Sequence, residues 1–477
     1  MAETVKNRGW SVTFAGTGIN LALGVLYSWS VIKKAIPAEW GWTDSEKALP
    51  YSVACLVFAF VMVPAGRMQD KIGPRWVATA GGILTGLGCI VASFATSVLW
   101  YVIGFGVLAG AGIGLGYASA TPPAVKWFPA RMTGLIAGLV VAGFGLASVY
   151  ISPLANYLAG NDYTGKPRAE LAQLMDAEKT AAGELKAARD TTPGAPALAA
   201  AQAKQAETAA ALLAAKEGSI SRTMLILGIG FLILVTLLAQ ILRAPPQGYK
   251  PEQAVAAPGA APAAAAAINV PPSAMLKTPL FYLLWIMYTF SAGAGLMIIA
   301  SLATIAKDGG IAAGFVLVAL LAIGNASGRI IAGMLSDRIG RLWTMFLIFV
   351  FQAVLMLVLR AGLSDFSAFV VVSMLMGFNY GACLSVFPSA TKDYFGLKNF
   401  GVNYGFVFTA WGVGGYLFSQ VAGWLYDKAF DPATNMGSYA NAYLVAAAAL
   451  FAAAALTFVT RAYERKFNAA QGAGAAR

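Results

Sequence analysis

The 477-residue chain is 58% hydrophobic and only 11% charged, whereas a soluble chain usually carries about 25% charged residues. The surplus of apolar side chains needs an environment other than water, which excludes a soluble enzyme and a disordered protein. The net charge is +12 and the chain has no histidine, so His-ligated metal sites and Ser-His-Asp triads are excluded. We therefore expect a membrane protein without catalytic residues, metal or cofactor.

Twelve continuous apolar segments are long enough to cross a bilayer core, which needs about 20 residues per helix. Lipid offers no partner for backbone N–H and C=O groups, and the runs do not alternate in polarity, so we expect helices and no barrel. The expected spans are 11–32, 49–66, 77–96, 99–121, 133–158, 223–243, 279–304, 311–335, 343–361, 366–389, 402–425 and 440–460.

Basic residues gather in alternate loops, which sets the expected topology. Lys6 and Arg8 precede the first span, and Arg461 and Arg465 follow the last. The positive-inside rule then predicts a multi-pass protein of the cell membrane with both termini in the cytoplasm. Because these charges are explained by topology, the lipid bilayer is the expected partner and nucleic acid is not. We expect a monomer.

Two longer segments interrupt the spans. Residues 161–217 are rich in Ala, Glu, Lys and Gln and predict two polar helices, 167–190 and 197–217, that form an extracytoplasmic helical hairpin. The charges of this insert nearly cancel, so no chemistry is assigned to it. It is either a cap or docking element or a variable decoration. Residues 244–275 are Pro- and Ala-rich, which is typical of a flexible cytoplasmic linker.

The two halves of the chain resemble each other. The first half comprises residues 1–160 and 218–243, and the second comprises residues 276–477. Both contain a G-x-x-x-D-[KR]-I-G loop, and the two copies lie 267 positions apart. A glycine permits close approach of helices, and the aspartate can face a helix terminus and basic neighbours. We expect either a topogenic basic turn or a conformational latch formed by Gly66, Asp70, Arg75, Gly333, Asp337 and Arg341.

Six spans, a linker and six spans, with this repeated loop, resemble the major facilitator superfamily. The resemblance implies an all-α membrane protein with twelve transmembrane helices in two six-helix halves. A narrower resemblance is to the oxalate/formate antiporter branch, close to bacterial monocarboxylate (lactate) transporters, and it implies the bacterial inner membrane. The stretches that carry it include residues 24–29, 109–117, 387–389 and 403–406.

Arg329 is the one clear charge inside the expected spans. It lies eight residues before Asp337, roughly 12 Å from the cytoplasmic loop, which is too deep for complete snorkelling. A charge at this depth normally faces a cavity and a partner. No carboxylate lies inside the spans, so a small carboxylate anion is the expected partner of the planar guanidinium. The alternative is an Arg that reaches the interface or caps helix carbonyls. In the resembled branch, an Arg at this position binds substrate carboxylate.

Amphipathic side chains complete the expected substrate-binding site. Asn325 lies one turn before Arg329 on the same helix face, and Tyr or Trp side chains can wall a small site while donating hydrogen bonds. The aromatic candidates are Tyr27, Tyr117, Tyr380 and Trp411. For any single aromatic, core packing is the alternative. The resemblance implies binding roles for the three tyrosines, but it also implies a second cation, a Lys, at the position that Trp411 occupies here.

A dianion that faces one fixed cation would leave a charge uncompensated in a low-dielectric cavity. We therefore expect a secondary active transporter of lactate-, pyruvate- or formate-type monocarboxylates that works by alternating access. The alternative is an oxalate/formate-type antiporter. No His and no acid inside the spans carries a proton, so either the substrate carries it, giving symport, or a counter-anion is exchanged, giving antiport; proton coupling is favoured.

Two other classes of membrane protein and one nucleotide-binding motif are also compatible with parts of the sequence. A receptor or scaffold would use the hairpin and would not need a buried Arg, and a channel would show no saturation. Residues 160–166 resemble the start of a P-loop, but Pro167 stands where Ser or Thr is required. Nucleotide binding is therefore rejected.

Overall fold

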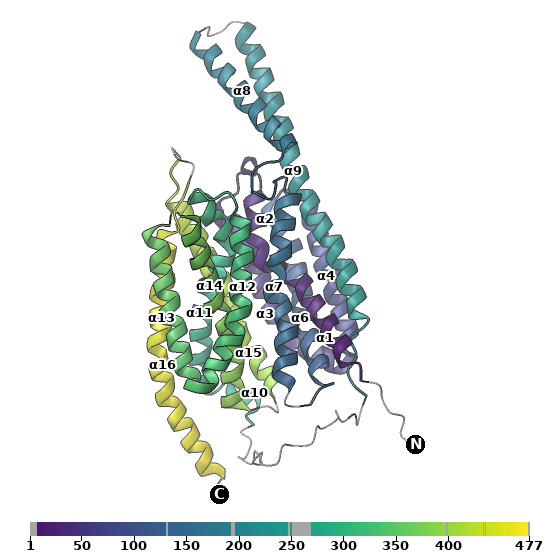
Figure 1. Cartoon of the computed structure of the whole chain (residues 1–477), viewed down its shortest axis with the longest axis vertical. Coiled ribbons are helices and arrows are strands. Elements are labelled where there is room, and N and C mark those ends of the chain that lie inside the picture. The colour runs from purple at the N-terminus through teal and green to yellow at the C-terminus, as the bar shows by residue number, and fades with distance from the viewer. Residues whose placement is uncertain are drawn as a thin grey trace.

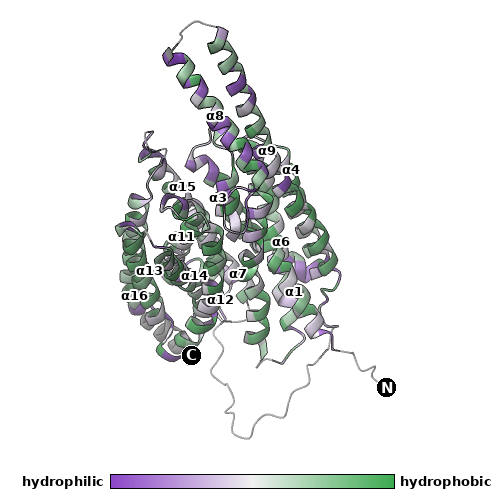
Figure 2. Ribbon diagram, turned by 45° about the horizontal axis from the view of Figure 1, so that its top comes forward, coloured by the Kyte–Doolittle hydropathy of each residue, from purple (hydrophilic) through white to green (hydrophobic). Residues whose placement is uncertain are grey.

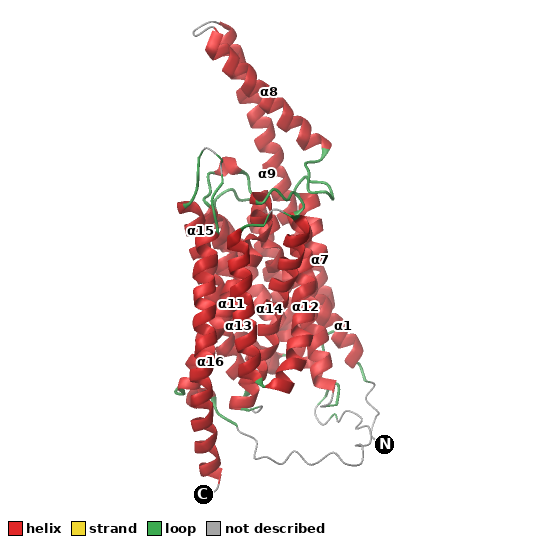
Figure 3. Cartoon of the chain, turned by 60° about the vertical axis from the view of Figure 1, so that its left-hand side comes forward, coloured by secondary structure: helices red, strands yellow, loops and turns green. Residues whose placement is uncertain are grey.

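The computed structural model describes residues 7–129, 132–191, 196–246, 249, 269–363, 365–396, 399–432, 434 and 436–475. Over these residues the chain forms helices and loops, with two isolated β-bridges and no strand (Figure 3). The helices stand side by side in one bundle, and a pair of helices extends from one end of it (Figure 1). The predicted all-α class is confirmed. Most of the expected linker, 244–275, lies outside the described residues.

The first half is built from long apolar runs with two local departures from α-helix. Span 1 is interrupted by a 3-10 turn, and span 4 contains a π-helical stretch; neither is visible in a hydropathy pattern. The elements are α1 (Gly9–Leu23), η1 (Gly24–Ser28), α2 (Trp29–Ala35), η2 (Ala38–Trp40), α3 (Asp44–Ile72), α4 (Pro74–Ser93), α5 (Val98–Tyr101), η3 (Val102–Ala109), α6 (Gly110–Val125), α7 (Thr133–Leu158), α8 (Ala169–Thr191) and α9 (Pro196–Ala239).

The second half repeats the pattern with fewer interruptions. Two of its helices begin at residues that cap the free N–H groups of the first turn: Thr278 accepts from the amide of Phe281, and Asp365 accepts from that of Ala368. The elements are α10 (Pro272–Met275), α11 (Pro279–Asp308), α12 (Gly314–Ile339), α13 (Arg341–Ala361), α14 (Phe366–Phe395), α15 (Phe400–Lys428) and α16 (Ala440–Ala475).

Eleven helical spans in the described part of the chain are long and apolar enough to cross a membrane. The remaining expected span, 402–425, corresponds to α15, which has 29 residues but is not among them. This helix packs against α3 of the first half and α11 of the second, and it carries the polar residues Asn403, Gln420 and Asp427. Its lower hydropathy fits a helix that is largely covered by protein, although Leu417 and Trp424 are exposed on its outer side.

The polar insert forms an antiparallel hairpin that extends beyond the bundle (Figure 1). Polar residues recur along α8, whereas apolar residues cover the bundle (Figure 2). The second expected helix does not end at residue 217, because α9 continues without a break into the sixth span. Gly218 is the only strong helix breaker near the junction, and a single glycine is tolerated inside a helix. The hairpin lies at the end opposite to the start of α1 and the end of α16.

The base of the hairpin is fixed to the loop between the first two spans. Trp40 Nε1 donates to Glu217 Oε1 at 2.7 Å, and Lys216 Nζ donates to Glu39 Oε1 at 2.5 Å. Partial burial works against ionisation of Glu39, but the hydrogen bond and charge of Lys216, a backbone hydrogen bond and the charge of Lys47 together outweigh it and hold the pKa of Glu39 below its ordinary value. These contacts hold the lower part of α9 against the bundle.

Glycines bring α12 and α14 into very close contact. Gly324 and Gly328 on α12 face backbone carbonyls of α14, and Gly377 and Gly381 on α14 face carbonyls of α12. Both pairs have the G-x-x-x-G spacing that lets two helix backbones approach. A side chain at any of these four positions would overlap a carbonyl oxygen of the other helix. This packing also fixes the positions of the residues that neighbour these glycines in the sequence.

We expect Gly328→Ala to lower the thermal stability of the purified protein, because its Cβ would overlap the carbonyl oxygen of Phe378. Overpacking of this kind costs about 1–3 kcal/mol. The matched control is Gly230→Ala in α9, where an added Cβ meets nothing within 4 Å. Thermal unfolding in detergent measures both variants. Equal midpoints would contradict the close-packing account.

Candidate functional site

Arg329 lies near the middle of α12, at the contact between the two halves. Its Nε donates to Asn325 Oδ1 on the preceding turn at 3.1 Å. Its Nη1 donates to the backbone carbonyl of Val141 in α7, which belongs to the first half, at 2.9 Å. Within the described residues, no carboxylate forms an ion pair with this guanidinium. These two neutral acceptors therefore stabilise the charge of Arg329, but they do not neutralise it.

Asn325 adds a free donor beside the guanidinium. The side chain is fully buried, and its Nδ2 has no hydrogen-bond partner among the described residues. Gly145 of α7 faces both groups: an added Cβ there would lie 3.5 Å from Arg329 Nη2 and 3.6 Å from Asn325 Nδ2. An unsatisfied buried amide is costly. Two donors that converge on one point suit an anion with oxygen acceptors.

Three aromatic side chains from three helices form a hydrogen-bonded chain that also crosses between the halves. The hydroxyls of Tyr27 in η1 and Tyr380 in α14 lie 2.8 Å apart. Trp411 Nε1 in α15 donates to the same Tyr380 hydroxyl at 2.8 Å. All three side chains are at most 2% exposed. Tyr380 is thus positioned by partners on both sides, next to the glycine contact of α12 and α14.

Tyr117 stands in an aromatic cluster that connects the remaining predicted residues. Its ring packs edge-on against Phe58 and Phe144, and it lies parallel to Phe408 at 6.4 Å between centroids. Phe144 also packs edge-on against Tyr27. The three phenylalanines were not predicted, because a Phe inside an apolar run looks the same whether it faces lipid or the interior.

The aromatic cluster and the guanidinium lie within electrostatic reach of each other. Arg329 interacts with the hydroxyl groups of Tyr27, Tyr117 and Tyr404. The structure therefore brings all six residues proposed for substrate binding into one region between the halves, although it contains no substrate to assign their roles. That region has one cation, several hydroxyl, amide and indole donors, and apolar walls.

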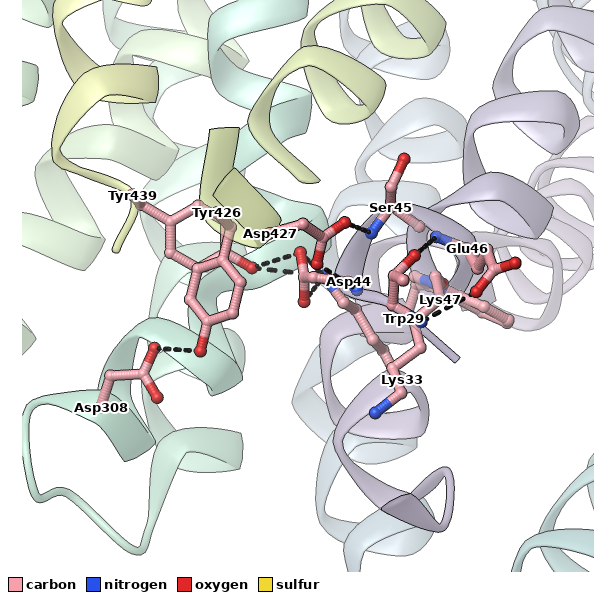
Figure 4. A network of polar contacts seen from close by, with 12 residues as sticks. Trp29, Lys33, Asp44, Ser45, Glu46, Lys47, Asp308, Tyr426, Asp427 and Tyr439 are labelled. Carbon is pink, nitrogen blue, oxygen red and sulfur yellow. Dashed lines mark hydrogen bonds and ion pairs between the residues drawn. The ribbon is translucent and has the colours of Figure 1, made fainter. Parts of the chain in front are cut away.

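Arg329 is partly buried, and a second cation in the described chain is buried more completely. Lys33, at the end of span 1, is 2% exposed and lies 2.7 Å from Asp44 Oδ1 (Figure 4). Sequence analysis missed this pair because Lys33 falls one residue beyond the expected span 11–32. The pair differs from Arg329 in that its charge is neutralised within the chain.

The two motif loops carry different ion pairs. In the first half, Lys126 Nζ lies 3.1 Å from Asp70 Oδ1, while Arg75 instead donates to Gln240 of α9. In the second half, the residue that corresponds to Lys126 is acidic, Asp393. Two acids then face each other, and a basic residue must bridge them.

Arg341 is that bridge. Its Nη1 lies 2.6 Å from Asp337 Oδ1 and its Nε lies 2.8 Å from Asp393 Oδ2. The starting glycines of the motif do not mediate close helix contact as expected: an added Cβ at Gly66 meets nothing within 4 Å, and at Gly333 its nearest neighbour is 3.7 Å away. It is instead the last glycine of each motif that the backbone requires: Gly73 and Gly340 both have a positive φ of 91°, which favours glycine.

Two halves of spanning helices that enclose a positively charged polar site between them define a secondary transporter. The Major Facilitator Superfamily model matches residues 10–165 and 284–476. The chain belongs to this family.

Relatives and solved structures agree with this assignment. The oxalate:formate antiporter of Oxalobacter formigenes is 26% identical over 462 residues, which cover 95% of this chain and 91% of the relative. Monocarboxylate transporter 13 of Bos taurus is 30% identical over 178 residues, which cover 37% of this chain and 41% of the relative. A bacterial homologue of the human lysosomal transporter Spinster, in an inward-facing and unoccupied conformation, aligns with a TM-score of 0.65 at 15% identity, covering 97% of this chain and 98% of the other.

We expect Arg341→Gln to destabilise the protein in low salt, because Asp337 and Asp393 would then face each other without a bridging cation. Exposed pairs contribute about 0–1 kcal/mol each, so the loss is small and should shrink as salt screens the repulsion. Thermal unfolding at two salt concentrations measures it. Arg338→Gln, which removes the same charge from an exposed position, is the control. An identical salt response of both variants would count against the bridging role.

Proposed function

We propose that this transporter carries small monocarboxylates of the lactate, pyruvate or formate type by alternating access of its two halves. The observation that carries the proposal is the pair of Arg329 and Asn325. A guanidinium without a carboxylate among the described residues and an amide without an acceptor both face the position of Gly145. A carboxylate placed there would take hydrogen bonds from both groups.

The single cation favours a monoanion over a dianion. Lys33, a buried cation, already pairs with Asp44. Trp411 offers an indole N–H where a second cation would serve a dicarboxylate, and that N–H already binds Tyr380. A second carboxylate would thus stay uncompensated in a site of low dielectric, at a cost of several kcal/mol.

Coupling follows from the lack of a proton carrier near Arg329. The chain contains no His, and the described ion pairs that include Asp or Glu lie at the ends of the bundle. We propose that the substrate itself carries the proton, which makes the protein a proton symporter. Anion exchange of the oxalate/formate type is the second candidate, and the relative from Oxalobacter formigenes, which covers nearly the whole chain, favours it.

The topology that we propose from the basic loops is consistent with this function. The termini and the loops with Asp70 and Asp337 would face the cytoplasm of a bacterium, across its inner membrane, and the α8–α9 hairpin would lie outside. The motif loops would act as the conformational latch on the cytoplasmic side. The protein would work as a monomer.

We expect Arg329→Gln to abolish most uptake of labelled lactate by proteoliposomes while the protein still folds. Loss of one partner of a buried charge pair costs about 2–5 kcal/mol of binding. Gln keeps hydrogen-bonding ability but not the charge, so a folded, inactive variant assigns the effect to the cation. Arg360→Gln, which removes the same charge from an exposed position outside the motif loops, should transport normally. Unchanged kinetics in Arg329→Gln would reject the binding role.

Trp411→Lys should shift preference from lactate toward oxalate, because a second cation would compensate a second carboxylate. Competition of unlabelled oxalate against labelled lactate measures the shift in the parent and the variant. Trp411→Phe is the control, since it removes the indole N–H without adding charge. Strong inhibition by oxalate in the parent protein would defeat the one-cation argument and favour the antiport alternative.

A further inference from the structure

Asp44 is the centre of a polar network at the hairpin end of the bundle (Figure 4). Its carboxylate receives Lys33 Nζ at 2.7 Å on Oδ1 and 2.8 Å on Oδ2. Both residues belong to the first half, and both are at most 9% exposed. The two buried charges neutralise each other within the first half, and removing either one would leave the other uncompensated.

The same residue is also bound by the second half. The Tyr439 hydroxyl donates to Asp44 Oδ2 at 2.8 Å. The Asp427 carboxylate, at the end of α15, accepts the backbone amides of Asp44 at 2.7 Å and Ser45 at 3.0 Å. These amides belong to the first turn of α3, so a carboxylate of one half caps a helix of the other.

The helices around the network are packed tightly enough to seal it. An added Cβ on Gly423 of α15 would lie 2.6 Å from the Cα of Ser45. Gln420 Nε2 donates to Ser52 at 3.0 Å across the same contact. Ala48, one turn beyond Asp44 on α3, is 1% exposed.

Other charged groups lie at this end but do not replace these contacts. Lys34 Nζ donates to the carbonyl of Ala312, another bond between the halves, at 3.1 Å. Asp308 accepts from Tyr426, both in the second half, at 3.1 Å. Lys47 interacts with Asp44 and Asp427.

The opposite end of the bundle has a different arrangement. Its ion pairs in the described residues each stay within one half: Lys126 with Asp70, Arg341 with Asp337 and Asp393, and Lys392 with Asp393. Polar contacts that cross between the halves are concentrated at the hairpin end and at the central site. Separation of the halves at the hairpin end would strip Asp427 of both donors and leave the amides of Asp44 and Ser45 without this acceptor, while α3 would keep its own cap at Thr43.

We propose that Asp427, Asp44, Lys33 and Tyr439 form a gate that closes the hairpin end of the transport path. Asp427 and Tyr439 are the parts that release when the halves separate, and the Lys33–Asp44 pair is the fixed part. Hydrogen bonds to charged groups are the strong class in proteins, so these few contacts set how often this end opens. The gate acts on the path and not on the substrate, so it holds whichever carboxylate is carried.

Accessibility of a cysteine at position 48 tests the gate without any substrate. The three native cysteines are buried and are replaced by Ala, and Ala48→Cys is introduced as the reporter. A membrane-impermeant maleimide is added to the purified transporter in nanodiscs, and the labelling rate is measured. Asp427→Asn, whose amide nitrogen cannot accept an N–H, should raise the rate roughly tenfold or more. Tyr439→Phe should raise it less, because it removes one hydroxyl.

The matched control is Asp365→Asn, which alters an acidic helix cap at the same end that contacts only its own half. It should leave the labelling rate unchanged. If Asp427→Asn does not fold, as judged by size-exclusion chromatography, Tyr439→Phe carries the test alone. The double variant Lys33→Met with Asp44→Asn, which leaves no unpaired buried charge, should also raise the rate. Equal labelling of the parent and the folded gate variants would overturn the gate, whatever the result for Arg329→Gln in uptake.

Discussion

A partly buried guanidinium at the contact between the two halves of a membrane protein is the constraint on which the proposed function depends. Burial of an unpaired cation is expensive, and a protein normally neutralises or hydrates it. Here Arg329 is held by an amide oxygen and a backbone carbonyl. Such dipoles lower the cost of burial but leave the net charge in place. The site therefore keeps an attraction for anions that hydrogen bonding within the chain does not use up.

The geometry of this site follows from glycine packing. The reciprocal contacts of α12 and α14 hold the two backbones together over two turns. Asn325 and Arg329 each follow a glycine on α12, and Tyr380 precedes Gly381 on α14. The spacing that lets the helices touch thus also fixes the charged and hydroxyl groups at the contact. The first half completes the site where span 1 loses regular α-helical form, at Tyr27 in η1.

Hydropathy predicts the spans because it is a local property of consecutive residues. The proximity of Asn325 and Arg329 could be predicted for the same reason, because they are separated by one helix turn. The gate could not be predicted in this way, because Asp44 and Tyr439 lie 395 positions apart and no pattern in either segment refers to the other. The continuous course of α9 was missed because the composition changes sharply from polar to apolar while the backbone does not. Phe58 and Phe144 give no signal until burial separates interior from lipid-facing phenylalanines.

Lys33 and Arg329 account for different parts of the proposed cycle. The charge of Lys33 is neutralised by Asp44 of its own half, so this ion pair persists whichever way the halves are turned. Only its weaker hydrogen bond to the Tyr439 hydroxyl, at 3.3 Å, crosses to the second half. Arg329 has its partners on both halves, because Asn325 belongs to one and Val141 to the other. Any rocking of the halves must therefore release or replace the bond to Val141. A carboxylate bound at Arg329 can take that place and neutralise the charge as the contact opens, whereas an uncharged solute could replace the hydrogen bond only. Selection for an anion and movement of the halves are then consequences of the same contact.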